Sequence, residues 1–214
     1  DLSFGSQENT YEVGPGHKVI AVADLDHDGA LDLAITSRKG DTLSLLFGRG
    51  DCTFATGPRL STPVGPQGLA VGDINEDGFE DVVTVNAASS YTRFLGTGPR
   101  TWAPGVSTPL ATGPLRCELQ DLNADGHLDM IVIKREWVDV FLGSGSGEFP
   151  AYTSYLAATP SPSDLDIADV NGDGALDLVA ARWDQSPGQI WLLLGNGDGT
   201  FQERSLVWES AGTT

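Results

Sequence analysis

The chain has 214 residues, of which 40% are hydrophobic, and its 30 Asp and Glu outnumber its 12 Lys and Arg to give a formal net charge of −18. This length is enough for one substantial core, and the acidity argues against a nucleic-acid partner, which would require a net basic surface. No apolar run is long enough to span a membrane. No signal peptide is visible either, although a mature or trimmed chain would lack one.

The first expected element is an isolated strand. Residues Ser3–Val13 align with the end of the first repeat, where Phe54 begins a segment that ends at Val64-Gly65. We therefore expect residues 1–16 to supply an extra outer strand before the first complete repeat.

The rest of the chain divides into repeats of about 48 residues, each of which predicts four short strands and shows no helical periodicity. In the first repeat the expected strands are Val19–Asp24, Leu31–Ser37, Thr42–Phe47 and Phe54–Pro63. A period near 48 is typical of four-stranded propeller blades. The prediction is a single all-β domain over residues 1–214, a β-propeller or part of one, built of four-stranded antiparallel blades. The expected blades are residues 17–65, 66–113, 114–161 and 162–214.

The connection between the first two strands of each repeat carries one nine-residue acidic pattern, whose four copies start 49, 48 and 48 residues apart. Positions 1, 3, 5 and 9 are Asp or Asn, so their side-chain oxygens can converge on one point. Position 7 varies and offers only its carbonyl, and position 6 is always Gly, which suits a turn with positive φ. The predicted metal ligands are Asp24, Asp26, Asp28, Ala30, Asp32, Asp73, Asn75, Asp77, Phe79, Asp81, Asp121, Asn123, Asp125, His127, Asp129, Asp169, Asn171, Asp173, Ala175 and Asp177.

An all-oxygen set with several carboxylates indicates calcium, because magnesium retains more water and zinc prefers His or Cys. An EF-hand is excluded, because its Glu at position 12 is replaced by Ile35, Thr84, Val132 and Ala180. The alternative is that each loop is only a solvated turn. Since 13 of the 30 acidic residues occupy these ligand positions, about four Ca²⁺ ions would account for much of the acidity.

The motifs resemble those of the FG-GAP/VCBS repeats, the calcium-binding blades of integrin α-subunits and of many secreted bacterial proteins. The similarity is clearest over Ala168–Val179 and Leu194–Phe201, and it extends over essentially the whole chain. It implies a propeller with calcium in these loops. It implies little about function, because one fold serves many functions.

The expected strand count does not fit a closed ring. An extra strand followed by four complete repeats gives 17 strands, whereas a four-bladed ring needs 16. Three arrangements stay open: a piece of a larger propeller, a closed four-bladed ring with one strand displaced, or two chains that complete an eight-bladed ring. The first and third arrangements are favoured. The expected partner is therefore either a second copy of the chain or the remainder of a larger propeller.

The loops on the face opposite the metal motifs gather basic and aromatic residues, which are suited to binding a sugar or a protein. The candidate ligand residues are Arg182, Trp183, Asp184, Trp137, Arg135, Tyr91 and Arg116. No catalytic motif is visible. Glu118 and Asp166 occupy positions expected to face the central channel, and Cys52 and Cys117 are expected to be free thiols, although one bridge is an alternative.

These features favour a secreted, non-enzymatic calcium-binding propeller that recognises carbohydrate or an extracellular protein. One alternative is the propeller portion of a polysaccharide-degrading enzyme such as a lyase. Another is a purely structural, self-assembling fragment.

Overall fold

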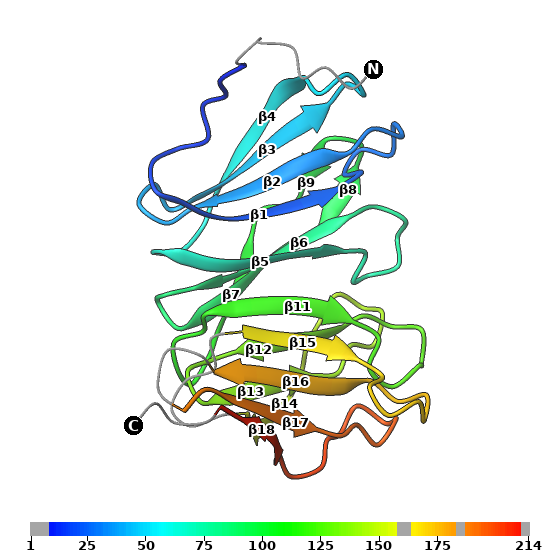
Figure 1. The fold of residues 1–214 in the computed structure, drawn as a ribbon. Coiled ribbons are helices and arrows are strands. Elements are labelled where there is room, and N and C mark those ends of the chain that lie inside the picture. Colours follow the sequence, from blue (N-terminus) through cyan, green and yellow to red (C-terminus); the bar gives the residue numbers. More distant parts are fainter. Residues whose placement is uncertain (1–8, 158–163, 183–186, 211–214) are drawn as a thin grey trace, which may run out of the picture.

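A computed structural model describes residues 9–157, 164–182 and 187–210 of the chain. These residues form antiparallel sheets of four strands each, which succeed one another along the chain (Figure 1). The first sheet contains β1 (His17–Ala23), β2 (Asp32–Ser37), β3 (Thr42–Gly48) and β4 (Phe54–Ser61). The second contains β5 (Pro66–Gly72), β6 (Asp81–Asn86), β7 (Ser90–Phe94) and β10 (Val106–Pro109).

The third sheet contains β11 (Arg116–Gln120), β12 (Asp129–Ile133), β13 (Trp137–Phe141) and β14 (Tyr152–Leu156). The fourth contains β15 (Asp164–Ala168), β16 (Asp177–Arg182), β17 (Gln189–Leu193) and β18 (Ser205–Glu209). A small hairpin of β8 (Gly96–Gly98) and β9 (Thr101–Trp102) is added in the second repeat and was not expected. No helix in the described part of the chain is long and apolar enough to cross a membrane.

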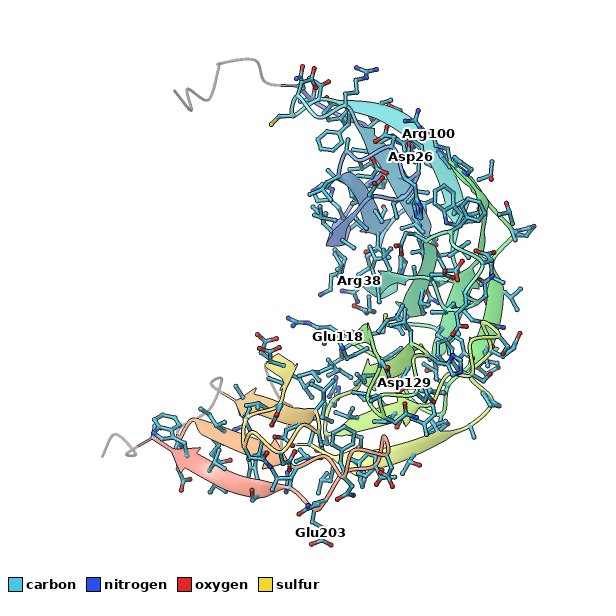
Figure 2. All side chains as sticks on the ribbon, turned by 90° about the vertical axis from the view of Figure 1, so that its right-hand side faces the viewer. Asp26, Arg38, Arg100, Glu118, Asp129 and Glu203 are labelled. Carbon is cyan, nitrogen blue, oxygen red and sulfur yellow. The ribbon has the colours of Figure 1, made fainter. Side chains whose placement is uncertain are left out.

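The four sheets are arranged as an arc, with β1, β5, β11 and β15 on its inner side (Figure 2). This is the blade arrangement of a propeller, and it confirms the predicted fold class. The arc of described residues is open between the first and fourth sheets (Figure 2), so the closed four-bladed alternative is wrong for this part of the chain.

The core lies between successive blades. Neighbouring residues of one strand belong to different hydrophobic clusters: Val82 packs towards the first blade and Val83 towards the third. Both are fully buried. Side chains alternate between the two faces of a strand, so a strand covered on both faces must be apolar throughout. This requirement explains the uninterrupted run Met130–Ile133, whose members also alternate between two clusters.

The prediction of an extra strand is wrong for its described part, because residues 9–16 lie in no strand and β1 begins at His17. The segment instead lies against the first blade. The Tyr11 hydroxyl accepts a hydrogen bond from the Phe54 N–H at 2.9 Å, and the Val13 carbonyl accepts one from the Ser44 hydroxyl at 3.2 Å. Hydrogen bonds that involve side chains thus attach this segment to the first blade, where the prediction expected backbone pairing between strands. Residues 1–8 lie outside the described part.

The cysteine prediction is confirmed, since Cys52 and Cys117 are both free. Cys117 is buried, and this burial raises the pKa of its thiol to about 12.

Candidate metal-binding loops

The four acidic loops join the innermost strand of each blade to the next strand, and they lie on the right of the molecule in Figure 1. Loop 1 (residues 24–32) is held by hydrogen bonds from its own backbone. Asp24 accepts the N–H groups of Asp28 and Gly29 at 3.1 and 2.9 Å, and Asp28 accepts that of Ala30 at 2.9 Å. Loops 2 (73–81), 3 (121–129) and 4 (169–177) repeat these three bonds. The carboxylates are therefore pre-positioned by the backbone.

The predicted positive φ at position 6 is confirmed, with values of 88°, 86°, 90° and 89° at Gly29, Gly78, Gly126 and Gly174. Position 4 has positive φ as well, although His27 and Glu76 stand there in loops 1 and 2. This second left-handed residue was not expected, because only loop 4 has Gly at position 4.

The Asp at position 9 has a structural role that the motif alone did not indicate. Asp32 is fully buried, and its Oδ2 and Oδ1 accept the N–H groups of Leu25 at 2.8 Å and of Gly48 at 2.6 Å. Gly48 lies at the turn after the third strand, so this carboxylate connects the metal loop to that turn. Asp81, Asp129 and Asp177 make the same pair of bonds.

Glycine at this turn is required by close approach to the metal loop. A Cβ atom on Gly143 would lie 2.2 Å from the carbonyl oxygen of Leu128, and Gly48 and Gly195 have the same separation from Leu31 and Leu176. Atoms cannot approach so closely, so any side chain here would push the turn away from the loop.

Burial raises the pKa of the position-9 carboxylates of loops 1–3, because desolvation penalises the charged form. The pKa of Asp81 is raised to about 6, and those of Asp32 and Asp129 are raised too, although the backbone N–H bonds oppose the shift. A cation close by would favour the ionised form.

The oxygen donors fit a hard cation. Carboxylate oxygens of Asp24, Asp26 and Asp28 lie within 4.8 Å of one another. Loops 2–4 have the same backbone pattern with Asn at position 3, which also offers an oxygen. A cluster of carboxylate and amide oxygens is the donor set that Ca²⁺ takes in proteins. Positions 1, 3 and 5 would hold such an ion, together with the carbonyl of position 7.

Two of the residues predicted to bind a ligand are buried. Tyr91 is 1% exposed and packs edge-on against Phe141 and Phe149, so the prediction that it lines a ligand surface is wrong. Arg182 is 8% exposed and donates to the Pro187 carbonyl at 3.3 Å. The prediction that it lies on an open ligand surface is therefore wrong as well.

Arg116, Arg135 and Trp137 lie at the same end of the third blade, because Arg116 pairs with Ile133, the last residue of β12. Trp137 and Arg135 are exposed, and Arg116 forms an ion pair with Asp164. Trp183 and Asp184 lie outside the described residues.

Glu118 points towards the inside of the arc (Figure 2), as predicted for a channel position. Burial, and secondarily the charge of Asp166, raises the pKa of its carboxyl group.

A groove that the sequence did not indicate lies beside the fourth blade. Its volume is about 500 Å³, and its lining combines the aromatic rings of Tyr155 and Phe201 with the polar side chains of Gln202, Glu203 and Arg204. Glu203 projects from the outer side of the arc (Figure 2). Phe201 follows the Gly-rich turn Gly195-Asn196-Gly197, which is the fourth-blade counterpart of the turn at Gly48. It is 7% exposed and packs in the core, and it also lines the groove.

The sequence model of the FG-GAP-like repeat matches residues 24–84, 121–180 and 169–214, which together make up most of the chain. The chain belongs to the FG-GAP-like repeat family. The search of curated proteins found no match to the sequence of this chain.

Several solved structures share the fold. A lectin of Agrocybe aegerita, described as recognising non-reducing terminal N-acetylglucosamine, has a TM-score of 0.56 and 17% identity over 94% of this chain and 68% of its own. The Vibrio cholerae biofilm matrix protein Bap1 has a TM-score of 0.56 and 21% identity over 87% of this chain and 28% of its own. A BBS1N chain in complex with ARL6DN has a TM-score of 0.60 and 14% identity over 94% of this chain and 59% of its own.

The FG-GAP-like chain therefore spans between 28% and 68% of the length of these proteins. At such low identities the likeness shows the fold alone.

Proposed function

We propose that this chain is a calcium-binding β-propeller that acts as an extracellular, non-enzymatic binding module, with carbohydrate as its ligand class. The observation that carries the calcium part is the fourfold repetition of one oxygen-rich loop with the same backbone hydrogen bonds. Loops of this kind in extracellular modules bind Ca²⁺ with dissociation constants of roughly 10⁻⁴–10⁻³ M. Calcium outside cells would fill them, and this supports the proposed location.

Calcium would serve the scaffold. Each loop gathers several carboxylates whose mutual repulsion opposes folding, and an ion that binds only the folded chain adds stability. We expect the melting temperature to fall when excess chelator is added. Asp173→Ala should remove one ion and leave the others. An unchanged melting curve in chelator would overturn the calcium part of the proposal.

Carbohydrate is supported by the chemistry of the groove beside the fourth blade. Sugars bind where an aromatic ring lies near groups that can hydrogen-bond to hydroxyls. The groove offers Tyr155 and Phe201 beside Gln202 and Glu203. The fold is also that of the Agrocybe aegerita lectin, which makes carbohydrate the first class to test.

A glycan array probed with the calcium-loaded chain tests this part directly. We expect a small set of glycans to bind, and Glu203→Ala to lower that binding at least about 10-fold, which is the effect of losing one well-placed hydrogen-bonding group. Arg49→Ala, an exposed change on the first blade, is the control. If binding were lost instead on Trp137→Ala, the ligand would lie at that end of the blades. No glycan binding together with cleavage of a polysaccharide would overturn the proposal in favour of an enzyme.

Self-association is a second candidate, favoured by an uncovered surface on the first blade. Ile20 and Val22 are 57% and 58% exposed. Their counterparts in the second blade, Leu69 and Val71, pack against the blade before them. A further blade, supplied by a second copy of the chain, could cover Ile20 and Val22. Light scattering would show a mass above the 22.5 kDa of one chain, and Ile20→Lys should reduce it.

A further inference from the structure

Arg100 contacts loop 1 from the neighbouring blade. It lies at the turn between β8 and β9, with φ of 60°. Its Nε pairs with Asp26, and its Nη2 lies 3.3 Å from Oδ2 of Asp28. Figure 2 shows the Arg100 and Asp26 side chains close together, where the first two blades meet. The guanidinium also lies over the ring of Phe47, with 4.6 Å between Cζ and the ring centroid. Two predicted metal ligands are thus already paired with a cation of the chain itself.

In loops 2–4 the corresponding carboxylate oxygens accept hydrogen bonds from a different donor. In each of them the position-3 residue is Asn, and its amide group donates to Oδ2 of the position-5 Asp. The three bonds measure 3.0, 2.9 and 2.8 Å, from Asn75, Asn123 and Asn171. Loop 1 has Asp26 in place of the Asn, so it has one more carboxylate among its predicted ligands and lacks the amide donor. Arg100 supplies the missing donor and balances the charge of this carboxylate.

The other repeats have no counterpart of this arginine. Counted back from the aromatic residue after each Gly-rich turn, Arg100 corresponds to Gly147 and Gly199, which share its left-handed backbone with φ of 74° and 79°. Gly147 also approaches the metal loop of the preceding blade, because its N–H donates to the carbonyl of Ile74 at 2.9 Å. The same position of the fold therefore faces loop 1 with a guanidinium and loop 2 with only a backbone N–H.

We propose that Arg100 is an internal counter-ion of loop 1 that competes with calcium, so that loop 1 takes up the ion at higher concentration than loops 2–4. The inference rests on the proposed calcium binding. Calcium at loop 1 must draw on the oxygens of Asp26 and Asp28 that now accept hydrogen bonds from Arg100. Charge-assisted hydrogen bonds are among the stronger ones in proteins, so their loss should weaken the affinity of loop 1 by about 10-fold or more.

The exchange has a structural consequence. Calcium at loop 1 would release Arg100 and with it the turn between β8 and β9, which belongs to the second blade. At low calcium the arginine joins the first two blades, and at high calcium the ion stabilises loop 1 alone. Loop 1 is thereby stabilised by a cation in both conditions.

Calorimetric titration of the chelator-treated chain with CaCl₂ tests the proposal. We expect a tighter class of sites from loops 2–4 and one weaker site. Arg100→Ala should tighten the weak site by about 10-fold, so that the two classes merge. Asp28→Ala should abolish the weak site alone, and Asp173→Ala should remove one of the tighter sites. Arg49→Ala is the matched control: it removes an exposed arginine from the Gly-rich turn of the first blade, so it changes the net charge equally.

Thermal melting supplies a second readout. In chelator, Arg100→Ala should melt at a lower temperature than the parent chain, because Asp26 and Asp28 lose their counter-ion. In saturating calcium the difference should disappear. If Arg100→Ala left the affinity of the weak site unchanged, or if the four sites of the parent chain had equal affinity, the inference would be overturned and the proposed calcium binding would stand. If calcium bound to none of the loops, the proposed function would fail and the inference with it.

Discussion

The two ends of the blades contrast in how closely the repeats agree. At the metal-loop end, each blade has the same buried Asp that accepts one N–H from its own loop and one from the Gly-rich turn. At the opposite end the connecting segments differ, and residues there that looked exposed, such as Tyr91 and Arg182, are buried. A fourfold pattern reports a shared structural requirement. A single polar or aromatic residue in one connection does not.

The largest expected effect lies at the metal-loop end. Asp129→Ala removes a fully buried carboxylate and leaves the N–H groups of Leu122 and Gly143 without their acceptor. Unpaired buried donors are costly, so we expect a loss of about 2–4 kcal/mol in the free energy of unfolding. Urea denaturation in excess chelator measures it. Asp125→Ala, which removes an exposed carboxylate of the same loop, should cost much less there, and equal losses would refute the structural role of Asp129.

The Gly-rich turn should be nearly as sensitive. Gly143→Ala would place a Cβ 2.2 Å from the Leu128 carbonyl oxygen, so the turn must move away from loop 3. We expect a loss of about 1–3 kcal/mol, which is typical of overpacking. Gly113→Ala is the control, because nothing lies within 4 Å of its Cβ position. Similar unfolding curves for the two variants would show that the turn does not depend on this close approach.

The opposite end should be tolerant. Trp137 is 44% exposed at the start of β13, and we expect Trp137→Ala to cost less than about 1 kcal/mol, because exposed substitutions rarely cost more. A loss as large as that of Asp129→Ala would mean that this end is as tightly specified as the metal loops. Denaturation under the same conditions compares the two directly.

The smallest effect concerns the inside of the arc and depends on pH. The pKa of Glu118 is raised in the folded chain by burial and by Asp166, so ionising it costs stability as the pH rises above its ordinary value of 4.5. Glu118→Gln should therefore stabilise the chain at pH 7, by less than about 1 kcal/mol, and leave it unchanged below pH 4.5. Unfolding measured from pH 4 to pH 8 in chelator would show this. A variant less stable at pH 7 would contradict the sign.

Much of the fold follows from the sequence because the repeats reinforce one another. The expected strand Thr42–Phe47 agrees with β3 to within one residue, since alternating apolar residues and the flanking Gly fix both ends. The β8–β9 hairpin was missed because its strands have only three and two residues, too few to show a periodicity. The buried Asp of each loop was interpreted as a metal ligand alone, because its hydrogen bond to a Gly-rich turn joins residues 14–18 positions apart. The groove lined by Phe201 was missed because the sequence does not show how neighbouring blades are placed.

The central claim is that the four loops bind calcium, and the number of ions bound measures it most directly. Non-denaturing mass spectrometry of the chelator-treated chain, repeated as CaCl₂ is raised to about 1 mM, should show three ions first and a fourth at higher concentration. Asp173→Ala should bind one ion fewer than the parent chain when calcium is saturating. A chain that acquires no defined number of calcium ions, or a variant that acquires as many as the parent, would contradict the account.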